Sequence, residues 1–338
     1  MNIALIYPIR IDLSDQHQID NLMLSGLLEE ELKQKGHQVF AFGKSLGVAD
    51  IDGRKMKSRQ EDKLVTIGKV ITAIIKSGIR FDIVHNCAGW QFFPFLELLG
   101  VPTVSTLIDG LSRNIKQKKI IASFRHFNLV STSNNQRDFF AGNSFLANCY
   151  FPLPFDDFVI KKQPRNYFAY YGELDQKSGV LAAIEIAKRA GIVLMIGGGI
   201  GSSEGDFFQE KVKRHIDGKD IRFVGELQAY QKEDFFGNAR ALLACYQRDD
   251  DAYTPLLEAL ACGTPVIGYA KGAVPEIIQH QKNGFVCASI NEAIESLDSL
   301  NKINREYCAQ DARYRFAVEK ITGEYLRVYD KVIVSEKK

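Results

Sequence analysis

The sequence predicts an α/β protein built from two Rossmann-like domains, each with a parallel β-sheet. Short apolar runs alternate with amphipathic helical stretches along the chain, which is typical of βα units. The length of 338 residues exceeds what one ordinary hydrophobic core needs, so two domains are expected. Residues 151–165 hold three prolines and lack a helical period, which predicts a linker between the two halves.

The apolar pattern of the N-terminal half predicts a first strand at residues 2–8 and a helix at 19–35, which Gly36 ends. The other strands expected in this half are 39–43, 81–85, 102–107 and 128–132. After the linker, the pattern predicts a helix at 181–191 and strands at 168–172, 193–199, 221–225, 239–245 and 265–269. A long helix is expected at about 303–333.

These elements define the expected domains. We place the first at 1–155 and the second at 160–305, with a C-terminal helix, about 306–334, that returns to the first domain. Ligands of parallel sheets bind beyond the carboxyl ends of the strands, so a ligand cleft is expected between the two domains.

The composition excludes several classes of protein. Lys and Arg number 43 and Asp and Glu 41, so the formal charge of +2 does not favour a nucleic-acid partner. The N-terminus lacks the features of a signal peptide, and no run reaches the roughly 18–20 apolar residues of a membrane span. The six cysteines are scattered without a C-x-x-C pair, which predicts a cytoplasmic protein without disulfides or structural zinc.

One segment, 249–286, contains the strongest candidates for ligand binding. Pro255 is tolerated only in the first turn of a helix, so a helix is expected to begin there with Glu258 in that turn. The loop before it holds Asp250, Tyr253 and Thr254. A helix N-terminus offers free N–H groups to a phosphate, and a nearby carboxylate can accept hydrogen bonds from vicinal ribose hydroxyls. The spacing alone leaves open that Glu258 only complements the helix dipole while Asp250 lies on a solvated loop.

The same segment resembles the donor-site signature of glycosyltransferase family 4, in which E-x7-E precedes A-x-A-C-G-T-P-V-I and G-x-x-P-E-I. The matching parts are Asp250 with Glu258, then 259–267, 272–277 and 283–285. Further parts follow in the family's order, at 168–179, 221–227 and 238–244, and more weakly at 81–85 and 101–106. The resemblance implies the GT-B architecture, with two Rossmann-like domains that face an interdomain cleft.

This resemblance also implies an activity, the transfer of a sugar from a nucleotide diphosphate sugar with retention at the anomeric carbon. Glu258 would hold the ribose, while Asp250 and Lys177 would act in catalysis on the sugar and the diphosphate. The other donor-binding candidates are Tyr253, Thr254, Gly172, Gly199, Gly225 and Leu227. The acceptor would be a sugar, a lipid-linked or a small molecule. No cofactor besides the donor is expected, and no residue cluster has metal-ligand spacing.

On the acceptor side, His85 and Asp109 are the candidates. His85 ends a predicted strand, where ligand sites lie, although a structural histidine fits that position equally well. Asp109 follows Ile108, which stands where the family places a histidine near the donor sugar.

The sequence departs from the family in the loop that binds the diphosphate. The family loop G-R-L-x-x-x-K-G carries an Arg and a Lys, but in this sequence Glu173 stands at the Arg position and Ser178 at the Lys position. Lys177 lies one residue before the Lys position. A carboxylate beside a diphosphate is repulsive. The glycine-rich loop expected after the first strand is also absent at 15–19, and Asp250 shortens the first Glu of the signature.

Three explanations of these departures stay open. Other cations compensate, with Lys177, Lys271 and Arg248 as candidates. Alternatively, the donor or acceptor differs from the family norm, or the chain binds without turnover as an inactive GT-B subunit. A nucleotide-sugar epimerase is a further alternative.

Three weaker signals have competing interpretations. Residues 197–201 are glycine-rich but lack the G-x-G-x-x-G spacing, so a turn near the donor phosphates is favoured over a dinucleotide site. Residues 113–127 mix basic and apolar side chains, which predicts either a solvated helix face or peripheral contact with the inner face of a membrane. The aromatic run 90–95 suits the first domain's core, or a platform for a sugar.

Overall fold

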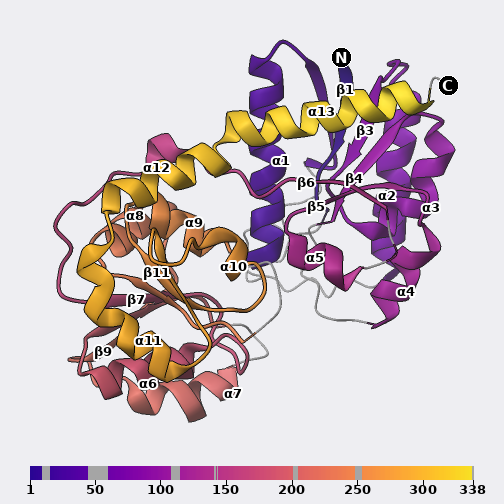
Figure 1. Cartoon of the computed structure of the whole chain (residues 1–338). Coiled ribbons are helices and arrows are strands. Elements are labelled where there is room, and N and C mark those ends of the chain that lie inside the picture. Colours follow the sequence, from indigo (N-terminus) through magenta and orange to yellow (C-terminus); the bar gives the residue numbers. More distant parts are fainter. Residues whose placement is uncertain are drawn as a thin grey trace. The chain divides into compact units, whose positions relative to one another are not determined.

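The computed structural model describes residues 1–9, 16–44, 60–107, 115–140, 142, 144–200, 205–247 and 253–336. The chain divides into two compact units, each with its own parallel six-stranded sheet (Figure 1). The first unit comprises Met1–Pro152 and Val318–Lys338, and the second comprises Leu153–Ala317.

The sheet of the first unit has the order β2-β1-β3-β4-β5-β6. Its strands are β1 (Asn2–Ile6), β2 (Gln38–Phe42), β3 (Ile83–Asn86), β4 (Thr103–Leu107), β5 (Asn128–Ser131) and β6 (Phe145–Asn148). Its helices are α1 (Gln16–Gln34), α2 (Gln60–Lys76), η2 (Trp90–Phe92), α3 (Phe93–Leu96), η3 (Glu97–Leu99), α4 (Ile115–Ser123), α5 (Asn134–Phe139) and α13 (Val318–Glu336). The order reverses between β1 and β3, where an open α/β sheet commonly binds a ligand.

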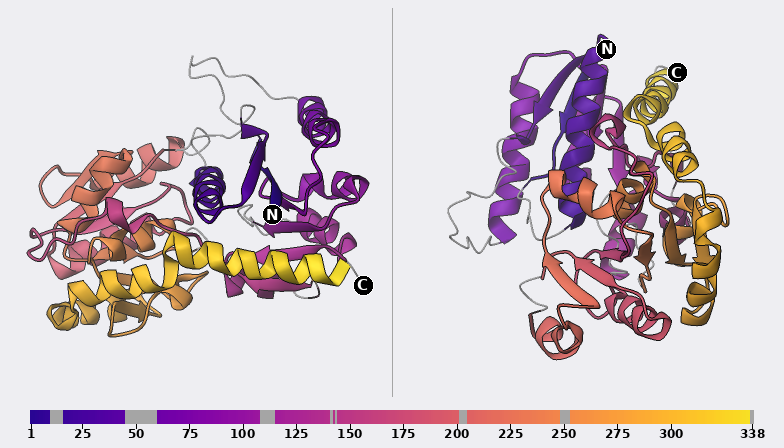
Figure 2. Two further views of the ribbon diagram at one scale, coloured as in Figure 1. Left: turned by 90° about the horizontal axis from the view of Figure 1, so that it is seen from above. Right: turned by 90° about the vertical axis from the view of Figure 1, so that its left-hand side faces the viewer.

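The two faces of this sheet follow from the alternation of side chains along each strand. Ala4 and Ile6 join a core cluster with Val84 and with apolar residues of α2, α3 and α4. On the other face, α13 packs against α1. The left view of Figure 2 shows α13 along its length. The buried residues of α13 recur at helical spacing and so form one face of the helix: Ile321, Thr322, Tyr325, Val328, Tyr329 and Val332.

The sheet of the second unit has the order β12-β11-β10-β7-β8-β9, which reverses between β7 and β10. Its strands are β7 (Phe168–Tyr171), β8 (Leu194–Gly197), β9 (Ile221–Gly225), β10 (Leu242–Ala244), β11 (Val266–Tyr269) and β12 (Gly284–Cys287). Right-handed crossovers place the helices of the two halves of such a sheet on opposite faces. Figure 1 shows one group of helices on one side of this sheet: α6 (Val180–Ala190), α7 (Gly205–Phe207) and α11 (Ile290–Ser296). Another group lies on the other side: α8 (Ala229–Gly237), α9 (Thr254–Ala261) and α12 (Arg305–Phe316).

The second unit also contains a series of helices, some of which begin at a side-chain cap. They are η4 (Phe155–Asp157), α6 (Val180–Ala190), α7 (Gly205–Phe207), η5 (Phe208–Val212), η6 (Lys213–His215), α8 (Ala229–Gly237), α9 (Thr254–Ala261), α10 (Val274–Ile277), α11 (Ile290–Ser296), η7 (Leu297–Lys302) and α12 (Arg305–Phe316). Ser289 caps α11 and Asn304 caps α12, since each side-chain oxygen accepts backbone N–H groups of the first turn.

Two features of the fold differ from the sequence prediction. The four-residue edge strands β6 and β12 were not predicted, because so short a segment carries almost no periodic signal. The C-terminal stretch predicted as one helix is instead α12 and α13, which are separated at Ala317. Ala317 is extended and pairs with Leu153, whose N–H donates to the Phe316 carbonyl at 2.9 Å.

Candidate functional site

The carboxyl edge of the second sheet is the place where the predicted donor-binding residues gather. The strand order reverses there between β7 and β10, and loops that follow neighbouring strands meet at one edge. Gly172 follows β7, Gly199 follows β8, Gly225 ends β9 and Glu258 lies on α9, which comes after β10.

The loop after β7 is folded by its own hydrogen bonds. The Tyr170 hydroxyl lies 3.2 Å from the carbonyl of Glu173 and donates to that of Ser178 at 2.9 Å. Ser178 is buried, and its hydroxyl donates to the Asp175 carbonyl at 2.8 Å. The side chain at the family's lysine position therefore supports the loop from inside, while Lys177 is exposed beside it.

The glycine run that follows β8 serves close packing against β7. A Cβ at Gly197 would lie 2.7 Å from a ring carbon of Tyr171, so only glycine leaves room for that ring. Gly198 has a φ of 135°, and a Cβ there would come within 1.8 Å of the Gly172 carbonyl oxygen. These contacts give the glycine run a role in packing. They favour the interpretation of the run as a turn and not as a dinucleotide-binding site.

The third glycine of the run lies beside the loop after β9. The nearest atom to a Cβ built at Gly199 is an oxygen of the Glu226 carboxylate, at 3.9 Å. Gly225 has a φ of 78°, and its carbonyl accepts the Gly198 N–H at 2.9 Å. Leu227 follows, half-buried, with its backbone hydrogen-bonded to Tyr171.

The N-terminus of α9 forms where Pro255 predicted it. Tyr253 and Thr254 are 1% and 2% exposed, so their side chains are packed inside and the backbone is what they can present to a ligand. The Tyr253 carbonyl accepts the N–H groups of Leu256 and Leu257, at 2.9 and 3.2 Å. Glu258 is the fifth residue of α9, just past the first turn in which the sequence placed it.

Glu258 is paired with a lysine that the sequence did not single out. The Lys232 ammonium on α8 donates to both carboxylate oxygens of Glu258, at 3.0 and 3.2 Å. Both side chains are nearly buried, at 14% and 10% exposure. The same ammonium lies 4.9 Å from the centroid of the Tyr171 ring, within the range of a cation–π contact.

Tyr171 joins these groups at the end of β7. Its ring packs edge-on against Phe235 and Phe236 of α8. Burial raises the pKa of the Tyr171 hydroxyl, and the Glu258 charge raises it further, while the Lys232 ammonium and the Leu227 backbone act in the opposite sense. The phenol therefore stays neutral, and the charges of the cluster are those of Lys232 and Glu258.

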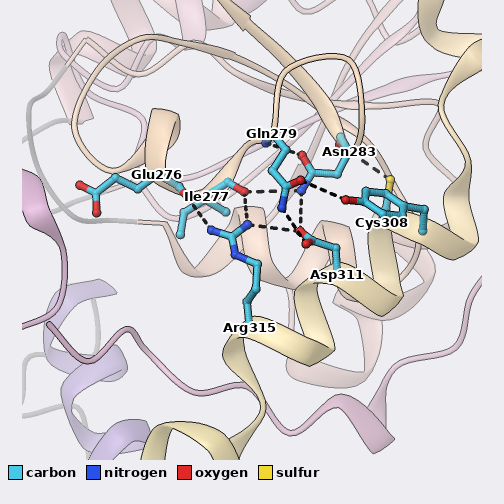
Figure 3. Close-up of polar contacts among 8 residues, drawn as sticks. Glu276, Ile277, Gln279, Asn283, Cys308, Asp311 and Arg315 are labelled. Atoms are coloured by element: carbon cyan, nitrogen blue, oxygen red, sulfur yellow. Dashed lines mark hydrogen bonds and ion pairs between the residues drawn. The ribbon is translucent and has the colours of Figure 1, made fainter. Parts of the chain in front are cut away.

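Figure 3 shows a polar network that holds the segment matching G-x-x-P-E-I and N-G-F to α12. Arg315 donates to the Ile277 carbonyl at 2.8 Å and to Asp311 at 3.2 Å. Asp311 also accepts from Gln279 at 2.7 Å and from Asn283 at 3.0 Å. These contacts from α12 stabilise the segment between β11 and β12, which accounts for Asn283, the asparagine of the signature.

Arg305 performs the same task for the A-C-G-T-P part of the signature. Its guanidinium donates to the carbonyls of Lys161, Ala239 and Gly237 and to the Thr264 hydroxyl, at 2.7–3.0 Å. Gly263 has a φ of 77°, and a Cβ there would approach the Arg305 carbonyl to 2.9 Å. Much of the signature is therefore structural, and Glu258 is its buried charge at the sheet edge.

In the first unit, His85 is fully buried. Its Nδ1 lies 2.7 Å from the Tyr329 hydroxyl on α13, and its Nε2 lies 2.7 Å from the Thr106 hydroxyl. Burial lowers the pKa of His85 to about 3, so the ring is neutral. Of the two roles that the sequence left open, these contacts favour the structural one, because both ring nitrogens already face protein hydroxyls.

Several predicted positions lie outside the described residues. They are Asp250, Asp109, Ile108 and Arg248. Within the described chain, Phe92 and Phe93 belong to the core of the first unit and Trp90 packs against it. This placement favours the core interpretation of the aromatic run.

The basic stretch 113–127 contains α4, on which Lys118, Lys119 and Ile120 are exposed and Ile121 is buried. These positions fit both interpretations of that stretch, so contact with a membrane stays a prediction. No helix among the described residues is long and apolar enough to cross a membrane. The cytoplasmic location is likewise still a prediction.

Comparison with known proteins identifies the second unit. Residues 155–315 match the family model described as glycosyl transferases, group 1. This unit is a group 1 glycosyltransferase domain. A 90-residue stretch is 34% identical to N-acetyl-α-D-glucosaminyl L-malate synthase of Bacillus anthracis. That stretch spans 24% of each protein.

Solved structures extend the likeness from the glycosyltransferase domain to the whole chain. Sucrose-phosphate synthase from Thermosynechococcus elongatus matches with a TM-score of 0.75 at 15% identity, covering 99% of this chain and all of that one. Anabaena HepE in complex with UDP-glucose matches with a TM-score of 0.72 at 14% identity, covering 98% and 100%. The chain therefore has the GT-B fold that the sequence predicted.

Lys232 is the residue of the glycosyltransferase domain that sequence reasoning missed. It lies 26 residues before Glu258, on another helix, within a stretch of mixed charge that resembles an ordinary solvated helix. The available signal was its place three and four residues before the buried pair Phe235 and Phe236, which hold this part of α8 against the sheet.

Proposed function

We propose that this protein transfers a sugar from a nucleoside diphosphate sugar, with UDP as the first candidate nucleotide, to an acceptor that is a sugar, a lipid-linked or a small molecule. The observation that carries the proposal is a buried carboxylate, Glu258, at the edge where the strand order of a glycosyltransferase domain reverses. Support for UDP comes from the structural relative whose complex contains UDP-glucose.

In this proposal the donor is held mainly by the second unit. The Glu258 carboxylate accepts hydrogen bonds from the two ribose hydroxyls, and the backbone N–H groups at the start of α9 face the phosphates. Lys177 and Lys271, which are exposed on the loops after β7 and β11, supply positive charge to the leaving diphosphate in place of the family's arginine and lysine. Transfer proceeds with retention and without a metal, and Asp250 orients the sugar.

Isothermal calorimetry with UDP, GDP and ADP tests the donor site. We expect UDP to bind and the Glu258→Ala variant to bind it at least about 100-fold more weakly, because two hydrogen bonds to a charged group contribute about 1.5–3 kcal/mol each. Glu258→Gln keeps the shape of the side chain and is expected to lose most of the same affinity. Glu185→Ala, which removes an exposed carboxylate from α6, is the control. Unchanged affinity in both Glu258 variants contradicts the proposed site.

A second candidate is a subunit that binds a nucleotide sugar without turnover. The observation in its favour is the diphosphate loop, where Ser178 is buried and Glu173 replaces the family's arginine. Incubation with UDP-glucose separates the two candidates: slow release of UDP in water indicates a transferase, whereas binding without release indicates the subunit.

A further inference from the structure

The Lys232–Glu258 pair is held in place by a chain of close contacts. Gly197 leaves room for the Tyr171 ring, and that ring lies beneath the Lys232 ammonium. The ammonium reaches both oxygens of Glu258, so one nitrogen holds both ends of the carboxylate. All of these groups lie on elements of the second unit: β7, β8, α8 and α9.

We propose that Lys232 is the positioning residue of the ribose subsite, which keeps the Glu258 carboxylate ionised and oriented for the vicinal hydroxyls of a ribonucleotide. This inference rests on the proposed function. Lys232 acts through Glu258. A carboxylate has about four acceptor positions, more than the two that the bonds from Lys232 occupy.

Burial explains why Glu258 needs such a partner. A carboxylate that is 7% exposed loses most of its hydration, which favours the protonated form. A protonated carboxyl is a weaker acceptor and presents a donor to one hydroxyl. An ammonium 3.0 Å away offsets the lost hydration and keeps the group charged.

Stability alone gives little reason to bury this pair. A buried ion pair stabilises a fold about as well as apolar side chains of the same volume, or less well. Phe235 and Phe236, which flank Tyr171 from the same helix, show that α8 presents apolar side chains to this part of the unit. The lysine therefore has a purpose beyond packing, and the carboxylate that it contacts is the one proposed to bind ribose.

The test compares UDP with 2′,3′-dideoxy-UDP, which lacks the two hydroxyls, by calorimetry between pH 6 and 8.5. The ratio of the two affinities isolates the contact with Glu258, because the phosphates titrate equally in both ligands. In the natural protein we expect a ratio of at least about 30, flat with pH, from two charge-assisted hydrogen bonds. In Lys232→Met we expect a ratio below about 10 at pH 6 that rises toward pH 8.5, since Glu258 then ionises only at higher pH.

Three further variants make the result specific. Lys232→Arg keeps the charge and is expected to keep a ratio that is flat with pH. Lys232→Gln removes the charge as Lys232→Met does, so it is expected to show the same pH-dependent ratio and replaces the methionine variant if that one does not fold. Lys161→Met is the matched control, because Lys161 is a partly buried lysine that pairs with Glu233 and Asp234 of α8 at 3.7 and 3.5 Å. Its ratio is expected to equal that of the natural protein.

The outcomes separate the inference from the proposed function. If the natural protein binds neither ligand, the proposed function is overturned, and the inference with it. If UDP binds but Lys232→Met and Lys232→Gln keep the natural ratio at every pH, the inference alone is overturned and Lys232 is a packing residue. If these variants lose affinity equally for both ligands, so that the ratio is unchanged, the inference is likewise overturned and Lys232 is a packing residue.

Discussion

In each unit a lysine donates to a buried glutamate and lies over the ring of a tyrosine at the end of the first strand, but the two lysines differ in exposure. In the first unit, Tyr7 donates to Glu29, and Lys44 also donates to Glu29 at 2.9 Å while lying 5.3 Å from the Tyr7 ring. In the second unit, Lys232 donates to Glu258 and lies over Tyr171.

The difference is where the positive charge lies. Lys33 and Lys44, which both contact Glu29, are 50% and 59% exposed, so water still hydrates their ammonium groups. Lys232 is 14% exposed. The first cluster thus resembles a surface ion pair built around a buried carboxylate, and it ties α1 to β1 and β2. The second buries both charges, which a fold tolerates most readily where a ligand uses them.

The largest expected effect comes from removing each lysine. Lys232→Ala removes the ammonium that donates to both oxygens of the buried Glu258 and should cost about 3–5 kcal/mol of the stability of the second unit. Lys33→Ala removes a half-exposed partner and should cost less than about 1 kcal/mol. Hydrogen exchange of α9 reports on the second unit, and fluorescence of Trp90, the one tryptophan of the sequence, reports on the first. Equal losses contradict the distinction between the clusters.

The acid response of Glu29 is the next effect in size. Burial acts to raise its pKa, but hydrogen bonds from Lys33, Tyr7 and Lys44 outweigh it and lower the pKa to about 2, from an ordinary value of 4.5. The stabilisation is therefore complete above pH 4.5 and is lost as the pH falls through 2, about 3 kcal/mol in total. Urea unfolding followed by Trp90 should show this loss, and Glu29→Gln should lack it. If the unfolding free energy of the natural protein changes no more between pH 5 and 3 than that of Glu29→Gln, this explanation of the acid response is wrong.

Between pH 7 and 5, above the range in which Glu29 titrates, His85 provides the smallest of the three effects. Its pKa is lowered to about 3 by burial, from an ordinary 6.5, so only the unfolded chain takes up the proton between these values. Stability is full above pH 6.5 and falls as the pH falls below it, by about 2 kcal/mol between pH 7 and 5. The slope of unfolding free energy against pH, measured with Trp90, should be flatter in His85→Gln. An identical slope in that variant argues against a buried neutral His85.

Local pattern was enough to predict the architecture. Strand and helix periods gave both parallel sheets except the short edge strands β6 and β12, and the rule for proline in helices placed the start of α9 at Pro255. These features are decided by residues within a few positions of one another, so a single sequence carries them. The signature around Glu258 identified the family for the same reason, since its residues are nearly contiguous.

Tertiary structure alone decided which side chains meet. Lys232 and Glu258 are 26 residues apart, and His85 and Tyr329 are 244 apart, and no periodicity links such positions. The same holds for Gly197, whose missing side chain makes room for a ring on another strand. Each of these contacts depends on how helices pack on a sheet, because packing brings distant residues together and removes the water that would otherwise hydrate their charges.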